Sequence, residues 1–348
     1  MFSGGKRARE LILKAKKRLG EELLILAHHY QRDEIVDVAD YRGDSLELSR
    51  KAAASEARWI VFCGVHFMAE TAAIVAGKGQ RVLAPGNPGC YLAHPEDRRL
   101  LASFWEKIVR VIPEEIVPVA YVNTTAEVKA FVGKRGGFMC TSANAGRILS
   151  YVLSQGKRVL FLPDVNLGWN TARALGVSPE EIAIWDPAFS PSDLERFRRA
   201  RVILWRRACA VHTRFLPEDV ERVRRERPDA RVVVHPECRP EVVKLADEVG
   251  STSHIIKTVS TSPPRSTWAV GTEERLVARL AAENPDKEVF SLAEFPPFCP
   301  FMSEVRLEDL AWVLEGLLYG EERNVVEVPP EIANTARAAL ERMFGALG

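Results

Sequence analysis

The feature that most constrains the fold is a short apolar run that recurs along the chain, ends in polar or small residues, and precedes a helical pattern. Residues 23–27, for example, end at His28, and residues 59–62 end at Cys63. Continuous apolar strands that alternate with helices are typical of parallel sheets covered on both faces, so the sequence predicts an α/β protein. The predicted strands are 23–27, 59–62, 81–84, 117–120, 137–140, 158–162, 182–185, 201–205, 231–234, 254–257, 267–270 and 288–290.

These strands fall into three similar sets. Each set starts with a strand whose end carries His, Tyr, or His with Glu, and each finishes in a loop with one cysteine. Such internal repetition predicts three α/β domains related by approximate three-fold symmetry, with short parallel sheets sandwiched by helices and a site at their junction. We predict domains at residues 1–110, 111–225 and 226–304. The C-terminal segment, 305–348, is predicted to form helices that pack back on the fold, at 307–318 and 330–344.

Charge and hydropathy exclude several classes of protein. The 348 residues include 48 basic and 47 acidic side chains, so the net charge of +1 creates no overall field to attract nucleic acid or an anionic membrane. The apolar run at 23–27 is far shorter than the roughly 18 residues of a membrane-spanning helix. The N-terminus is basic with helical spacing, and no signal-type apolar core follows it. We therefore expect a cytoplasmic protein that binds neither nucleic acid nor a membrane.

The chain has six cysteines and no CxxC pair, which disfavours a local zinc site. Cys90, Cys209 and Cys299 each lie in the loop that ends one α/β set. Three thiolates from three domains can hold a four-iron cluster and leave one iron open as a Lewis acid. Spacing alone leaves two alternatives open, namely a site built from the other cysteines and buried cysteines without metal. The other set, closer to the strands, is Cys63, Cys140 and Cys238.

Titratable and hydroxyl side chains follow the ends of the predicted strands. Ligands bind at the carboxyl ends of strands in parallel α/β sheets, so we expect these side chains to meet in one pocket. The candidate proton-transfer groups are His28, Tyr30, Tyr121, His212, His235 and Glu237. The candidate anion holders, with ordinary helix capping as the alternative, are Asp44-Ser45, Thr141-Ser142 and Ser251-Thr252. The sequence lacks the glycine motifs of Walker and dinucleotide sites, which argues against nucleotide binding.

Ten sequence elements occur in a fixed order across nearly the whole chain. They are 27–31 (AHHYQ), 43–48 (GDSLEL), 62–72 (FCGVHFMAETA), 121–124 (YVNT), 140–145 (CTSANA), 209–212 (CAVH), 235–238 (HPEC), 250–253 (GSTS), 270–273 (VGTE) and 299–302 (CPFM). Any one of them is a weak signal. Together, at compatible spacing, they resemble the quinolinate synthase (quinolinate synthetase A) family.

This resemblance implies three pseudo-symmetric α/β domains around one oxygen-sensitive [4Fe–4S] cluster. Cys90, Cys209 and Cys299 match its ligands, and the fourth iron has no protein ligand. The resemblance also implies a transferase of NAD biosynthesis, which condenses iminoaspartate with dihydroxyacetone phosphate to quinolinate and releases phosphate and water. An iminoaspartate-producing enzyme would then be its functional partner.

The resemblance also leads to a hypothesis for the mechanism. We expect Tyr30, His212, His235 and Glu237 to move protons during isomerisation and dehydration. The open iron chelates substrate oxygens, and hydroxyls of Ser142, Ser251 and Thr252 hold phosphate or carboxylates. The expected substrate-binding residues are His28, Ser45, Tyr121, Asn123, Ser142, His235, Glu237, Ser251 and Thr252.

Several positions depart from the family pattern. Residues 83–90 lack the acid that usually precedes the first cysteine, and the stretch 90–121 is a few residues longer than usual. Arg207 stands where a glycine usually precedes the second cysteine by two, so a bulky side chain lies next to a ligand loop. Trp169 replaces a usual Arg, and Ser303 replaces a usual Lys.

Two rival functions use the same three cysteines. One is a cluster-dependent hydro-lyase that acts on another hydroxy acid. The other is a non-catalytic iron–sulfur redox sensor, against which the many polar residues at strand ends argue, because an electron carrier needs no polar pocket.

Overall fold

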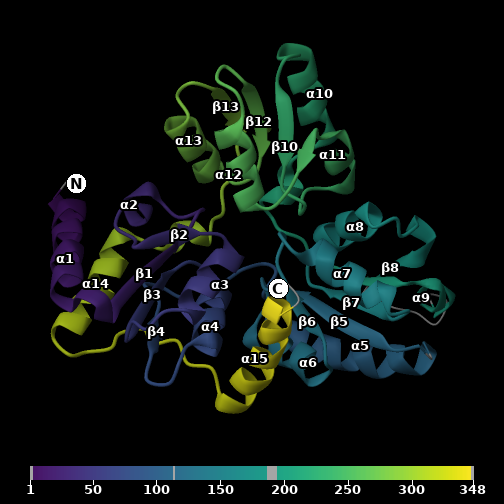
Figure 1. Cartoon of the computed structure of the whole chain (residues 1–348), viewed down its shortest axis with the longest axis horizontal. Coiled ribbons are helices and arrows are strands. Elements are labelled where there is room, and N and C mark those ends of the chain that lie inside the picture. Colours follow the sequence, from purple (N-terminus) through teal and green to yellow (C-terminus); the bar gives the residue numbers. More distant parts are fainter. Residues whose placement is uncertain (1–2, 113, 186–193, 346–348) are drawn as a thin grey trace.

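The computed structural model describes residues 3–112, 114–185 and 194–345. Within them the chain forms three parallel sheets with flanking helices, and the three parts of the chain around these sheets meet at the centre of the molecule (Figure 1). We refer to these parts as the first, second and third units. The predicted fold class is confirmed.

The first unit contains a four-stranded sheet in the order β2-β1-β3-β4. Its strands are β1 (Leu23–His28), β2 (Tyr41–Gly43), β3 (Trp59–Cys63) and β4 (Arg81–Leu83). Its helices are α1 (Ser3–Leu19), α2 (Asp33–Val36), α3 (Ser45–Ala53) and α4 (His66–Val75). Every residue of β3 is buried, as expected for a strand covered on both faces. Asp44 starts α3 with a capping box, because its carboxylate accepts from Leu46 N–H and Glu47 N–H.

The second unit contains a five-stranded sheet in the order β6-β5-β7-β9-β8. Its strands are β5 (Ile116–Tyr121), β6 (Phe138–Cys140), β7 (Arg158–Leu162), β8 (Ile182–Trp185) and β9 (Val202–Trp205). Its helices are α5 (Asp97–Val111), α6 (Ala126–Lys134), α7 (Ala145–Ser154), α8 (Val165–Ala174) and α9 (Leu194–Arg199). Thr125 caps α6 and Asp164 caps α8, so these helices begin in the turns that follow β5 and β7.

The third unit repeats the strand order of the first, as β11-β10-β12-β13. Its strands are β10 (Arg231–Val234), β11 (Glu248–Val249), β12 (Thr267–Gly271) and β13 (Glu288–Ser291). Its helices are α10 (Pro217–Glu226), α11 (Pro240–Leu245), α12 (Thr252–Thr261) and α13 (Glu274–Glu283). By strand order, β3, β7 and β12 occupy equivalent positions, and the helices that follow them are α4, α8 and α13.

One predicted strand is wrong. Residues 254–257 lie in the helix α12, and the strand of this part of the chain is the two-residue β11. The side chain of Ser251 accepts from His254 N–H and starts the helix, and the buried Ile255 and Val259 follow helical spacing. A short apolar run does not distinguish a strand from a buried helical turn, and here the Ser251 cap favours the helix.

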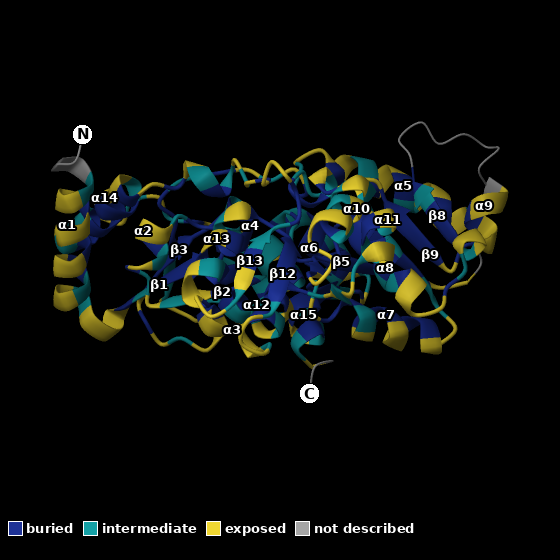
Figure 2. Ribbon diagram, turned by 90° about the horizontal axis from the view of Figure 1, so that it is seen from above, coloured by how far each residue is buried: buried dark blue, intermediate teal, exposed yellow. Residues whose placement is uncertain are grey.

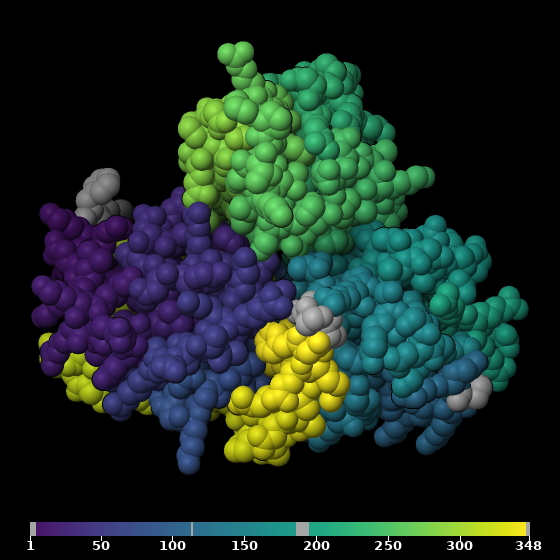
Figure 3. All heavy atoms as spheres, in the orientation of Figure 1, coloured from purple at the N-terminus to yellow at the C-terminus, as the bar shows by residue number. Residues whose placement is uncertain are grey.

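The two C-terminal helices pack on different units. Helix α14 (Leu307–Leu318) shares a core with α1, in which Ile12 and Leu314 are fully buried. Helix α15 (Pro330–Gly345) lies between the first two units on the surface drawn in Figure 3. Arg342 of α15 donates to the carbonyls of Gly133 and Gly137 in the second unit, and Arg337 donates to those of Val75 and Ala76 in the first. Both helices agree with the prediction.

Burial follows the layers of the fold. Figure 2 shows buried strands inside and exposed helix faces outside, and α1 carries its exposed face along one end of the molecule. No helix among the described residues has both the length and the apolar composition that crossing a membrane requires. The domain boundaries at 110, 225 and 304 stay a prediction, and residues 1–2, 113, 186–193 and 346–348 of these ranges lie outside the described residues.

Candidate active site

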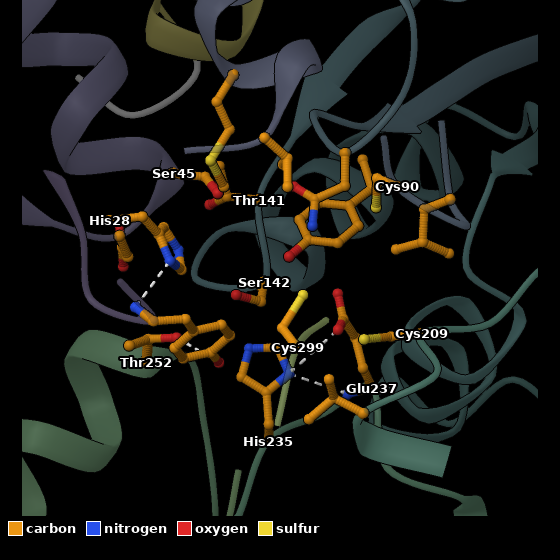
Figure 4. Close-up of a pocket in the computed structure, with 18 of the residues that line it drawn as sticks. His28, Ser45, Cys90, Thr141, Ser142, Cys209, His235, Glu237, Thr252 and Cys299 are labelled. Atoms are coloured by element: carbon orange, nitrogen blue, oxygen red, sulfur yellow. Dashed lines mark hydrogen bonds and ion pairs between the residues drawn. The ribbon is translucent and has the colours of Figure 1, made fainter. Parts of the chain in front are cut away.

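All three units contribute side chains to one pocket at their junction. Figure 4 shows the thiols of Cys90, Cys209 and Cys299 directed toward one region, across from His28 and Thr252. The predicted site residues that line the pocket are His28, Tyr30, Ser45, Cys90, Tyr121, Asn123, Ser142, Cys209, His212, His235, Glu237, Thr252 and Cys299. They meet because β1, β5 and β10 end at the pocket, as the carboxyl ends of parallel strands do.

Hydroxyl groups from three helix starts border the pocket. Ser45 and Thr252 are the first residues of α3 and α12, and Ser142 lies in the turn before α7. Asn144 holds this turn, because its Oδ1 accepts from Thr141 N–H at 2.6 Å. Helix N-termini attract anions through free N–H groups and the helix dipole, so this wall of the pocket suits phosphate or carboxylate groups.

Ser251 is the one predicted substrate-binding residue that does not line the pocket. It is buried, and its hydroxyl accepts from His254 N–H at 3.3 Å as the cap of α12. Ser251 therefore acts as a helix cap, which was the alternative to anion binding in the sequence analysis. Its neighbour Thr252 borders the pocket.

Glu237 and two histidines form a buried cluster on the side of the third unit. His212 Nδ1 lies 2.6 Å from Glu237 Oε2, and the rings of His212 and His235 stack with centroids 4.3 Å apart. Burial alone would raise the pKa of Glu237, but the hydrogen bond from His212, with smaller contributions from other neighbours, outweighs it and holds this pKa below its usual range. Among the described residues Glu237 Oε1 has no hydrogen-bond partner, which leaves this oxygen for a ligand.

Burial keeps two other imidazoles neutral. It lowers the pKa of His28 to about 3 and that of His235 to about 3, with neighbouring histidines adding to the effect. His28 Nδ1 accepts from Tyr30 N–H at 3.1 Å, and His235 Nδ1 accepts from Glu237 N–H at 3.3 Å. A neutral ring with an accepting Nδ1 carries its proton on Nε2, so both rings can donate from Nε2.

Tyr30 connects the first unit with the third. Its hydroxyl lies 2.8 Å from Thr272 Oγ1 and 3.2 Å from Thr252 Oγ1, and Thr272 Oγ1 lies 3.2 Å from His212 Nε2. Burial raises the pKa of Tyr30 well above its usual value, so the phenol keeps its proton. The sequence prediction missed Thr272, although it lies in the element 270–273, because the side chain faces Tyr30 and His212 only after the units have packed.

The two sets of cysteines differ in their surroundings. Cys90, Cys209 and Cys299 are partly exposed and line the pocket, whereas the other three cysteines, Cys63, Cys140 and Cys238, are buried and lie outside it. Burial raises the pKa of Cys90 to about 12 and that of Cys299 to about 11, so both thiols hold their protons until a metal displaces them.

The donor set around these thiols fits an iron–sulfur cluster. Backbone N–H groups two or three residues further on partly offset the effect of burial on the pKa of each thiol, from Leu92 and Ala93 for Cys90, from His212 for Cys209, and from Phe301 and Met302 for Cys299. Such N–H groups stabilise cluster thiolates. Cys209, His212 and Glu237 also form a group whose ligand atoms lie within 4.8 Å of one another and that could hold a metal ion.

The fold and the pocket define a class of protein, an α/β enzyme whose three units surround one site of thiols, imidazoles and a carboxylate. A family model described as "Quinolinate synthetase A protein" matches residues 10–345, and the chain belongs to this family.

Relatives across this family are similar over most of their length. The chain is 46% identical over 332 residues to the quinolinate synthase of Geobacillus sp. (strain WCH70), a match that covers 94% of the chain and 90% of the relative. It is 44% identical over 334 residues to the quinolinate synthase of Bacillus subtilis (strain 168), with the same coverage of both chains, 94% and 90%. The quinolinate synthase of Listeria innocua is 44% identical over 336 residues, with 96% and 92% covered.

Proposed function

We propose that this chain condenses iminoaspartate with dihydroxyacetone phosphate to quinolinate, with release of phosphate and water, in the de novo biosynthesis of NAD. The observation that carries the proposal is the single pocket in which three thiols, an imidazole–carboxylate cluster and three helix-start hydroxyls meet. Membership of the family supports the same reaction.

The cofactor of this proposal is one [4Fe–4S] cluster per chain, held by Cys90, Cys209 and Cys299. Bound there, the cluster supplies an open iron that acts as a Lewis acid toward substrate oxygens. The convergence of the three thiols on one pocket supports this assignment, and so do the backbone N–H groups that favour the thiolate form of each cysteine.

The protein's own residues then bind and orient the substrates. Ser45, Ser142 and Thr252 hold the phosphate and carboxylate groups at the starts of α3, α7 and α12. Tyr121 and Asn123 also line the pocket, and Asn123 Oδ1 has no hydrogen-bond partner among the described residues, so it is available to a substrate N–H or O–H group. Ser251 contributes by starting α12 rather than by contact.

Proton transfer falls to the chain of groups that runs from Tyr30 through Thr272 and His212 to Glu237. Glu237 Oε1 accepts a proton from the substrate. The hydrogen bond between His212 Nδ1 and Glu237 Oε2 stabilises the negative charge of the carboxylate before this transfer. The neutral Tyr30 hydroxyl donates a proton to a leaving hydroxyl, and His28 Nε2 and His235 Nε2 donate to substrate oxygens. Together these steps supply the proton removals and additions that isomerisation and dehydration need.

We further propose that the protein acts in the cytoplasm on small molecules, without a nucleic-acid or membrane partner. A separate enzyme that produces iminoaspartate would supply one substrate. The even charge balance and the six free cysteines are in keeping with such a compartment.

The test is anaerobic purification followed by iron and sulfide counts, a visible spectrum and an assay for quinolinate. About four irons per chain and quinolinate formation are expected. Ala variants of Cys90, Cys209 and Cys299 should each lose the cluster, while the matched control Cys140→Ala, a buried cysteine outside the pocket, should keep it. Iron-free protein after anaerobic reconstitution would refute the cofactor, and a full cluster without quinolinate would refute the reaction.

A further inference from the structure

Two buried carboxylates lie behind the cysteine loops of the second and third units. Asp164 follows β7 and caps α8, and Glu273 follows β12 and caps α13, so the two occupy equivalent positions in their units. Both side chains are completely buried. Neither belongs to the set of residues that line the pocket.

Each carboxylate joins a helix start to the peptide group of a cysteine. Asp164 Oδ1 accepts from Leu167 N–H at 2.7 Å, and its Oδ2 accepts from Cys209 N–H at 2.9 Å. Glu273 Oε2 accepts from Arg275 N–H at 2.9 Å, and its Oε1 accepts from Cys299 N–H at 3.2 Å. One oxygen of each pair therefore caps the helix and the other holds the cysteine.

The carbonyl groups of the same two cysteines are held in matching ways. Cys209 C=O accepts from Thr213 N–H at 3.1 Å and from Thr213 Oγ1 at 2.8 Å. Cys299 C=O accepts from Ser303 N–H at 3.2 Å and from Ser303 Oγ at 2.8 Å. With hydrogen bonds on both sides of the α-carbon, the direction of each Cα–Cβ bond is set before any metal binds. Ser303, which departs from the family pattern, performs the same contact as Thr213.

Helix capping alone does not require a buried carboxylate in this protein. Thr125 and Ser251 cap α6 and α12 with neutral hydroxyls. In the first unit Val65 precedes α4 without a side-chain cap, and the loop is joined instead by a hydrogen bond from His66 N–H to the carbonyl of Pro88 at 2.9 Å. Burial of a carboxylate opposes folding unless the group is well bonded. What the carboxylate adds over a hydroxyl is the second oxygen, which reaches the cysteine.

We infer that Asp164 and Glu273 are positioning residues that hold Cys209 and Cys299 in the arrangement that receives an iron–sulfur cluster. The inference rests on the cluster proposed above. Partners of metal ligands typically change metal affinity by 10–100-fold when they are removed, because they orient the ligands. The two carboxylates act through the peptide backbone and touch neither substrate nor iron.

The experiment compares Asp164→Asn and Glu273→Gln with a matched control, Asp247→Asn. Asp247 is also a carboxylate that accepts a backbone N–H, from Val232 at 2.7 Å, but it contacts no cysteine. Each protein is reconstituted anaerobically, and the release of iron to a chelator is followed by visible absorbance, with the melting temperature of the iron-free protein as a second readout. A milder third variant, Ser303→Ala, removes one hydroxyl from Cys299 C=O and keeps the backbone bond.

We expect iron release to be roughly tenfold faster in Asp164→Asn and Glu273→Gln than in the wild type, with no change in Asp247→Asn. Ser303→Ala should accelerate release less. If iron is released at the wild-type rate while the iron-free protein melts at a lower temperature, the two residues are helix caps only. This result would overturn the inference and leave the proposed cofactor untouched. A wild type that takes up no iron would overturn the proposed cofactor and the inference together.

Discussion

The guanidinium of Arg207 lies on the buried carboxylate of Asp97, with Nη2–Oδ1 at 2.7 Å and Nε at 3.0 Å from both oxygens. Asp97 is the first residue of α5, which follows the Cys90 loop, and Arg207 precedes Cys209 by two. The pair thus joins the loops of two of the pocket's cysteines. The side chain that stands in place of a usual glycine is therefore directed at α5 and does not line the pocket.

Replacing Arg207 with Ala should lower the free energy of unfolding by about 2 kcal/mol, because it leaves the buried Asp97 carboxylate without its charged partner. Denaturant unfolding of the iron-free protein measures the change. Arg201→Ala is the control, since Arg201 and Glu181 are 3.9 Å apart with exposed side chains, and it should change stability by less than about 1 kcal/mol. Equal effects of the two variants would contradict a structural role for the Arg207–Asp97 pair.

Replacing Glu237 with Gln should reduce turnover by at least roughly a hundredfold, since the amide cannot accept a substrate proton as the carboxylate does. Iron content should stay at the wild-type level, because the three thiols are unchanged. Glu241→Gln, an exposed position on α11, serves as the control for quinolinate assays. Near-normal turnover of Glu237→Gln would remove this residue from the proton-transfer chain.

Replacing Thr272 with Val should lower kcat roughly tenfold, because Tyr30 and His212 lose the hydroxyl that lies between them. Val has nearly the volume of Thr and leaves no cavity, but His212 Nε2 loses its hydrogen-bond partner, so the melting temperature should also fall modestly. Thr272→Ser restores the hydroxyl and should restore most of kcat. If Ser and Val variants have the same rate, the hydroxyl has no part in turnover.

The stability of the iron-free protein should fall as the pH is lowered from 6.5 toward 3, and His28 should account for part of this loss. Burial holds the pKa of His28 at about 3 in the folded protein, against an ordinary value of 6.5 in the unfolded chain. Over this interval the unfolded chain binds a proton that the folded protein does not, so acid favours unfolding by up to about 1.4 kcal/mol per pH unit. Above pH 6.5 His28 is neutral in both the folded and the unfolded chain, so it no longer makes stability depend on pH.

The comparison of wild type with His28→Asn isolates this contribution, because Asn does not titrate. Denaturant unfolding at pH 7.0 and 5.5 should show a smaller acid loss in the variant. An identical loss in both proteins would mean that His28 is protonated in the folded state as readily as in the unfolded chain.

Replacing Gly133 with Ala should displace α15 from α6. A Cβ atom at this position would lie 1.8 Å from the backbone carbonyl oxygen of Thr335, and a backbone atom cannot move aside as a flexible side chain can. A loss of roughly 1–3 kcal/mol in unfolding free energy is expected. Gly146→Ala on α7 is the control, since nothing lies within 4 Å of its Cβ position, and it should be neutral or stabilising. Equal stability of both variants would contradict close packing of α15.

Most of the fold was predictable because the patterns that specify it are local. Runs such as those in β1 and β3 are buried on both faces, and their apolar residues are contiguous in the sequence. The prediction failed at residues 254–257, where a buried helical turn and a strand have the same composition and the Ser251 cap decides between them. The edge strands β2 and β11 were also missed, since their sequences, Tyr41-Arg42-Gly43 and Glu248-Val249, contain no contiguous apolar run.

The candidate site, like the fold, was predictable from the sequence only in part. The sequence by itself determined which side chains end the strands, because their positions follow from the alternation of strands and helices. Together with the family resemblance it identified the polar side chains that line the pocket, but it predicted none of the apolar ones, which are Leu46, Val65, Phe67, Met68, Leu92, Val211 and Met302. Only the tertiary structure decided that Thr272 lies between Tyr30 and His212, and that Asp164 and Glu273 hold two cysteines. These contacts join residues 26 to 242 positions apart in the chain. Those of Thr272 form only when the units have packed against one another, and those of Asp164 and Glu273 form only when the second and third units have each folded.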